Sequence, residues 1–143
     1  MAVRVKVKLK VEGREVTTSA LANSSFETEE PEAVLPLRVA EKLSLYPKLP
    51  GGTVVEEYIG VGGFKVSTFR VPGALKVYVV CGDRVKGPIG AVAVITPGES
   101  EVILSDRVLD ILGIILIRPS EGFWRFNDDP LVTVRRSVPR EVW

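Results

Sequence analysis

The chain has 143 residues, of which 45% are hydrophobic and 26% charged, with a formal net charge of +1. These values predict one globular domain with a real core, and they exclude a disordered or strongly basic chain. There is no histidine and only one cysteine, which excludes Ser-His-Asp and Cys-His catalysis, histidine-ligated metal and an internal disulfide within one chain.

The use of cysteine suits a reducing compartment, so we expect a cytoplasmic protein. No apolar run reaches the roughly 18 residues that span a bilayer, and we expect no membrane segment. The first residues alternate charge with valine and lack the apolar centre of a secretory signal. No cofactor and no metal site are predicted.

The first half of the chain predicts a hairpin, a loop and a helix. Residues 3–11 alternate apolar and basic side chains, which is typical of a half-buried strand. A glycine turn leads to a return strand at residues 15–22. Residues 23–32 are polar and acidic and are expected to form a loop. A helix is predicted to begin near Leu35-Pro36 and to end before Pro47.

The second half predicts many short strands and one more helix. Ser105 is typical of a helix N-cap, and Gly113 of the residue that ends such a helix. Glycines at 60, 62 and 63 predict a hairpin tip. Strands are expected at residues 54–59, 64–71, 75–81, 89–95, 101–104, 114–117 and 123–126.

This pattern predicts a mostly β fold, a small barrel or sandwich with two short helices. Residues 1–128 are expected to form the domain. Residues 129–143 are basic and partly alternating. They are expected to form a C-terminal tail or a strand that pairs with another chain in a dimer.

The order of these elements resembles the retropepsin-like aspartic proteases, single-domain proteins that dimerise to build one active site. The phrase ILSDRVLDILGI resembles that family's helix signature, with Ser105 where glycine is usual, and YIGVGGF resembles its flap. The resemblance implies a small closed barrel, a homodimer and a peptide or protein ligand. It also implies ligand contacts from the flap residues Gly60, Val61, Gly62, Gly63 and Phe64.

The family's catalytic Asp-Thr/Ser-Gly motif is replaced here by Asn23, Ser24 and Ser25. Aspartic proteases need two carboxyls that share a proton, one acting as base and the other as acid. An asparagine amide does not titrate in the useful range and cannot take a proton from water. The sequence therefore favours a degenerate peptidase, a pseudoenzyme that binds a peptide or partner or serves assembly, and leaves enzyme activity open.

Two alternatives remain open. Glu27, the acidic residue closest to the turn, would be the substitute carboxylate of an active hydrolase. The stripe formed by Arg4, Lys6, Lys8 and Lys10 would track a phosphate backbone in a nucleic-acid-binding barrel. For Glu27, a position in a solvated loop is favoured over a catalytic role. For the basic stripe, a solvent-facing strand is favoured over nucleic-acid binding, unless Arg135, Arg136 and Arg140 lie on the same surface. Cys81 is expected to be buried and inert.

Overall fold

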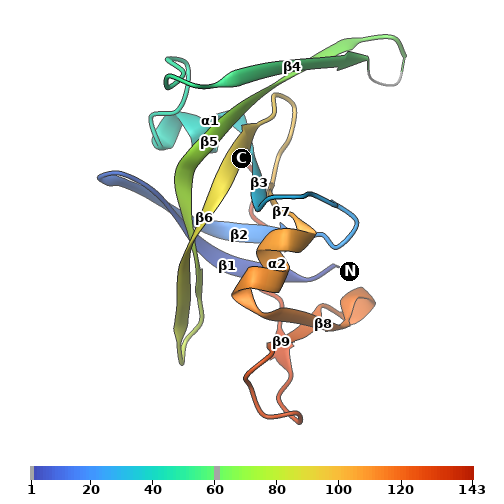
Figure 1. Ribbon diagram of the computed structural model, residues 1–143. Coiled ribbons are helices and arrows are strands. Elements are labelled where there is room, and N and C mark those ends of the chain that lie inside the picture. Colours follow the sequence, from blue (N-terminus) through green and yellow to red (C-terminus); the bar gives the residue numbers. More distant parts are fainter. Residues whose placement is uncertain (1, 60–61) are drawn as a thin grey trace.

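A closed six-stranded barrel forms the body of the molecule in the computed structural model, which describes residues 2–59 and 62–143 (Figure 1). The ring closes because β5 pairs with both β6 and β1. Around the ring the strands are β1 (Arg4–Val11), β2 (Arg14–Ala22), β7 (Val102–Leu104), β3 (Glu32–Leu35), β6 (Val85–Ile95) and β5 (Lys65–Val80). The expected mostly β closed barrel is confirmed.

The barrel interior is filled by the apolar faces of the strands. Val5, Val7 and Leu9 of β1 are at most 1% exposed, as the alternation in the sequence predicts. Removal of these side chains from water drives formation of the barrel. β4 (Val54–Ile59) lies outside the ring and forms a long hairpin with the first half of β5.

The strand β3 was not predicted, because residues 32–35 follow an acidic loop and precede a proline. Ala33 and Leu35 are nevertheless fully buried. β3 runs parallel to β6 and antiparallel to β7. These partners are distant in sequence, so local patterning did not indicate the strand.

β5 is one strand of 16 residues where two were predicted. The two predicted strands, 64–71 and 75–81, left Pro72 and Gly73 between them. Instead Gly73 takes a positive φ of 66° and the register with β6 shifts between Val71 and Leu75. This is the geometry of a β-bulge, which bends the strand without ending it. The partner strand β6 likewise begins earlier than predicted, at Val85.

Two short helices complete the barrel, as expected. α1 (Leu37–Lys42) is shorter than predicted, since the chain leaves the helix before Ser44, which has a positive φ of 57°. α2 (Asp106–Leu112) begins at the N-cap Ser105 and ends at Gly113, whose φ of 72° is left-handed. Both predicted ends of α2 are confirmed. No helix in the described part of the chain is long and apolar enough to cross a membrane.

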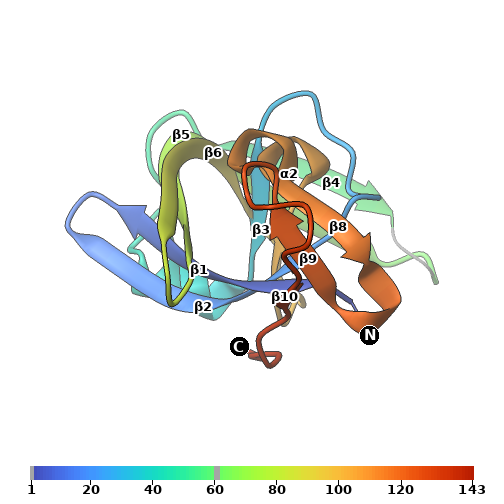
Figure 2. The same ribbon diagram turned by 90° about the horizontal axis from the view of Figure 1, so that it is seen from below.

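A small second sheet lies below the barrel, beside α2 (Figures 1 and 2). β8 (Ile114–Arg118) leads through the 3-10 turn η1 (Pro119–Glu121) to β9 (Phe123–Phe126), and β9 pairs with β10 (Arg135–Arg136).

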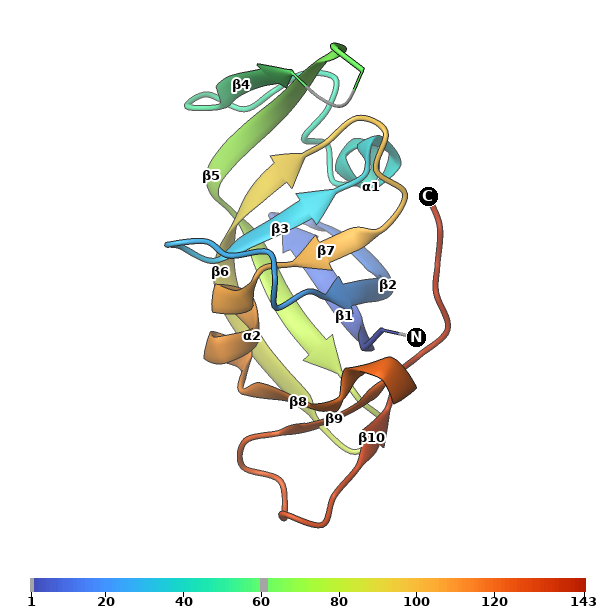
Figure 3. The same ribbon diagram turned by 90° about the vertical axis from the view of Figure 1, so that its right-hand side faces the viewer.

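The first part of the predicted tail, which contains β10, thus pairs with β9 of its own chain. The rest of the tail runs along the side of the barrel (Figure 3). There Val138 N–H donates to the Arg4 carbonyl at 3.0 Å, and Trp143 Nε1–H donates to Thr18 Oγ1 at 2.9 Å. Pairing of residues 129–143 with another chain stays a prediction.

An ion network fixes the small sheet to the β5–β6 turn. Asp129 accepts hydrogen bonds from Arg135 Nε at 2.7 Å and from the Phe126 N–H at 2.8 Å. Arg135 also holds Asp83 with two hydrogen bonds, at 2.7 and 2.9 Å. The hydrogen bonds from Arg135 hold the pKa of the Asp129 carboxyl well below its ordinary value.

We expect Asp129→Asn to destabilise the protein by roughly 3 kcal/mol near neutral pH, because it removes the buried carboxylate that pairs with Arg135 and leaves that guanidinium with only the exposed carboxylate of Asp83. A carboxyl with a lowered folded pKa contributes stability above its unfolded pKa, about 3.9 for aspartate, and loses it as the pH falls toward the folded value. Urea unfolding at a series of pH values should therefore show a steep loss below about pH 4 in the wild type and a shallower one in the variant.

Asp128→Asn is the matched control. Asp128 also binds Arg84, but its side chain is 55% exposed against 5% for Asp129. An exposed pair contributes about 1 kcal/mol or less. Equal destabilisation by the two substitutions would contradict this account of the network.

Candidate functional site

The turn that follows β2 is closed by its own first residue. Asn23 Oδ1 accepts hydrogen bonds from Ser25 N–H at 3.1 Å and from Ser25 Oγ–H at 2.7 Å. The Asn23 carbonyl accepts from Phe26 N–H at 3.1 Å. Asn23 is half-buried, and Ser24 and Ser25 are exposed. The residues predicted for the degenerate motif therefore do form one compact turn.

This geometry leaves a donor, not an acceptor, at the turn. The oxygen of the Asn23 amide is already shared by two donors of Ser25. The Nδ2 amide group donates to no acceptor in the described part of the chain. An amide nitrogen of this kind can hydrogen-bond a carbonyl or carboxylate but cannot act as a base.

The start of α2 holds the loop that follows the turn. The buried Ser105 Oγ accepts from Glu32 N–H at 3.1 Å, and Ser105 N–H donates to the Glu32 carbonyl at 3.0 Å. Asp106 N–H donates to the Phe26 carbonyl at 2.9 Å, while its carboxylate accepts from Thr28 N–H at 3.0 Å. Both ends of the loop are thus tied to one helix start.

Asn23 borders a shallow hollow of about 270 Å³. Its other walls come from the start of β1, the end of β2, and the segment from β8 into η1, including Leu116 and Pro119. The turn therefore faces the region between the barrel and the small sheet, and it is open to a ligand or a second chain.

Glu27 lies elsewhere. It is exposed and borders a separate hollow of about 550 Å³ together with Glu29, Glu30, Glu32 and Arg70. No residue lines both this hollow and that of Asn23. Glu27 and Asn23 thus line different hollows of the single chain, and the role of Glu27 as a substitute carboxylate stays a prediction.

Arg70 was not singled out from the sequence. Its guanidinium lies 2.7 Å from Glu32, 3.2 Å from Glu30 and 3.6 Å from Glu56. The hydrogen bond to Glu32 raises the pKa of Arg70. The sequence signal that could have indicated this pairing is the excess of glutamates in the 23–32 loop, which favours a basic side chain nearby from another strand. This pairing ties the loop to the base of the β4–β5 hairpin.

The predicted flap is a hairpin in the structure. Gly62 and Gly63 take positive φ values of 86° and 80°, and Phe64 is 74% exposed. Gly60 and Val61, the other predicted contacts, lie outside the described residues. Figure 1 shows the hairpin projecting above the barrel on the same side as the loop after β2.

Two of the four basic residues of the stripe on β1 form ion pairs. Arg4 pairs with Glu101 at 2.7 Å, Lys10 with Glu15 at 3.9 Å, and Lys8 lies over the Tyr78 ring at 4.6 Å. The nucleic-acid hypothesis required Arg135, Arg136 and Arg140 on this surface. Arg135 and Arg136 come to the Arg4 end of the strand, and Arg140 binds Glu101, the partner of Arg4, at 2.9 Å. Arg135 and Arg136 line a cavity with Arg4, so nucleic-acid binding stays an untested alternative.

The remaining candidates for chemistry are weak. Cys81 is half-buried, and not buried as predicted. Its partial burial still raises the pKa of the thiol, which disfavours the nucleophilic thiolate. Within residues 2–59 and 62–143, no group of three or more His, Cys, Asp or Glu side chains is arranged to hold a metal ion.

Comparison with known proteins identifies the fold. No protein-family model matches the chain, and no curated protein gives a significant match. Among solved structures, the chain is similar to the retroviral protease-like domain of Ddi1 from Leishmania major. The TM-score is 0.51, the identity 12%, and the match covers 97% of each chain. The predicted retropepsin-like fold is confirmed, and at this identity the likeness shows the fold alone.

The role of Asn23 as the acceptor that closes the turn can be tested by substitution. Asn23→Asp keeps an oxygen at the same place and should change the free energy of unfolding by less than about 0.5 kcal/mol. Asn23→Ala removes the acceptor of both Ser25 donors and should cost about 1 kcal/mol in urea unfolding.

Ser24→Ala is the control, because Ser24 is exposed and its side chain makes no hydrogen bond in the described part of the chain. If Asn23→Asp were as destabilising as Asn23→Ala, the turn would not depend on this oxygen.

Proposed function

We propose that this protein is a binding domain of retropepsin-like fold that lacks aspartic protease activity, acts as a homodimer and holds an extended peptide or partner strand. The observation that carries the proposal is the state of Asn23. Its oxygen is committed to Ser25, and the group left for a ligand is an amide N–H.

The absence of a carboxyl at this turn removes the usual reaction. Aspartic proteolysis needs a base to take a proton from water and an acid to protonate the carbonyl of the peptide. Two copies of the chain would place two amides at this point. They would donate hydrogen bonds to a ligand carbonyl while leaving the attacking water unactivated.

The β4–β5 hairpin supports peptide binding. Within the described residues β4 pairs only with β5, so its outer edge has free backbone donors and acceptors. An extended peptide can add to such an edge as a further strand. Val54, Val55, Ile59 and Phe64 are more than half exposed along this hairpin, which provides apolar contacts for the side chains of a ligand.

The small sheet supports dimerisation. β8 is an edge strand beside the Asn23 hollow, and its Ile115 and Ile117 are 36% and 38% exposed. An apolar edge strand is a ready site for pairing with another chain. A second copy placed there would enclose the open hollow next to Asn23.

We predict that the protein retains peptides without cutting them. Purified protein is incubated with a complex mixture of unstructured peptides from acidic to neutral pH, and cleavage is followed by mass spectrometry. No cleavage above a protein-free blank is expected. Peptides retained by the immobilised protein are identified in parallel, and Phe64→Ala should reduce retention at least about fivefold, since burial of part of a phenyl ring contributes about 1 kcal/mol.

Val132→Ala controls for loss of an exposed apolar side chain away from the hairpin. Cleavage that disappears in Glu27→Gln but persists in Glu99→Gln, an equally exposed carboxylate, would replace this proposal by the hydrolase alternative. Absence of any retained peptide would remove the binding function.

A further inference from the structure

A cavity of about 540 Å³ lies between the start of β1, the end of β5 and the small sheet. It exists because the pairing of β1 with β5 runs only from Lys10↔Lys76 to Val7↔Val79. Beyond Val7 the two strands separate, and the tail after β10 crosses the opening. The cavity shares no lining residue with the hollow at Asn23.

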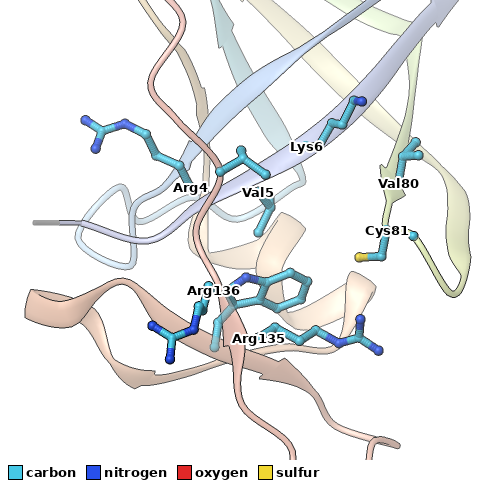
Figure 4. Close-up of a pocket in the computed structure, with 10 residues that line it drawn as sticks. Arg4, Val5, Lys6, Val80, Cys81, Arg135 and Arg136 are labelled. Carbon is cyan, nitrogen blue, oxygen red and sulfur yellow. The ribbon is translucent and has the colours of Figure 1, made fainter.

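The rim of the cavity is basic. Four of the residues that line it are cationic and none is acidic; the four are Arg4, Lys6, Arg135 and Arg136. Figure 4 shows the basic side chains spread around the rim, with Val5 and the sulfur of Cys81 between them.

Two of the four cations are held in place by carboxylates. Arg4 makes two hydrogen bonds to Glu101, at 2.7 and 3.2 Å, and Arg135 is bound by Asp129 and Asp83. Lys6 and Arg136 are exposed and form no ion pair within residues 2–59 and 62–143. Their charges are therefore available to an anionic ligand at opposite sides of the rim.

The floor of the cavity is apolar. Val5 and Trp124 are 1% and 3% exposed, and Val80 and Val138 are half-buried. Trp124 Nε1–H is buried and donates to no acceptor in the described part of the chain. Because this N–H has almost no accessible surface, it lies beneath the floor of the cavity and is not a contact for a ligand there.

From this combination we propose that the cavity binds an organic anion, a carboxylate or phosphate attached to an apolar body. Its volume lies within the range of small-molecule sites, which are mainly apolar with a few polar groups that fix orientation. The apolar body lies on the valines and the Trp124 ring. The anionic group meets Lys6 or Arg136, whose charges attract it across the open rim.

The test uses 4-phenylbutyrate and 4-phenylbutyl phosphate as probes, with 4-phenylbutanamide as the neutral equivalent and inorganic phosphate as the anion without an apolar body. Binding is measured by calorimetry on the unmodified chain. In Trp143→Phe, Trp124 is the sole tryptophan, and its emission reports whether a probe enters the cavity. A preference between the two anionic probes identifies the head group.

We expect saturable binding of at least one anionic probe with a change in Trp124 emission. The double substitution Lys6→Gln with Arg136→Gln should weaken it at least about tenfold, because charge-assisted contacts are lost. The control pair, Lys48→Gln with Arg14→Gln, removes two exposed charges elsewhere and should leave affinity unchanged.

Three results would overturn the proposal. The first is no saturable heat up to about 10 mM probe, where a site with a Kd of about 1 mM would be mostly filled. The second is equal binding of the neutral amide or of inorganic phosphate alone. The third is unchanged affinity in the Lys6 and Arg136 variant, with thermal melting showing that the variant is folded.

Discussion

The hydrogen bonds between the start of α2 and the loop after β2 are the constraint on which the candidate site depends. Ser105 is fully buried and bonds Glu32 in both directions, while Asp106 bonds Phe26 and Thr28. The loop would otherwise be a polar, acidic segment with little apolar burial to order it. α2 is itself packed against β6 and β8. The core therefore fixes the position of the loop and of the Asn23 turn through α2.

A polar turn held this firmly can present one chemical group in a fixed direction, and here that group is an amide. Asn23 closes this turn with a side-chain oxygen that accepts hydrogen bonds from Ser25, two positions on. An amide stands at this position, and not a titratable carboxyl. Two carboxylates of the following loop, Glu30 and Glu32, are engaged with Arg70, so their charge ties the loop to β5. The basic cavity lies apart from it and has a different chemical character.

Local patterns predicted most of the elements but not how distant segments meet. The alternation in β1 and the two end signals of α2 were sufficient to predict these elements, since each pattern lies within a few consecutive residues. β3 was missed because its burial comes from β6 and β7, and β5 was divided because a bulge at Gly73 looks like a turn in sequence. At the site, the resemblance indicated that Asn23 to Ser25 lie in a polar turn, as they do in the structure, and their correspondence to a catalytic motif stays a prediction. It gave no indication of which amide atom is occupied, of the pairing of Arg70, or of the basic cavity, since each depends on residues far apart in the chain.

The most direct test of the central claim is a crystal structure of the protein, read for the position of Asn23 in neighbouring copies. The account predicts two chains related by a two-fold axis, with their Asn23 turns facing each other beneath the β4–β5 hairpins. Each Asn23 side-chain oxygen should accept hydrogen bonds from Ser25 of the same chain, with the amide nitrogen directed into the shared cleft. Asn23 turns that lie apart on the outer surface of the assembly would contradict the proposed dimeric binding site.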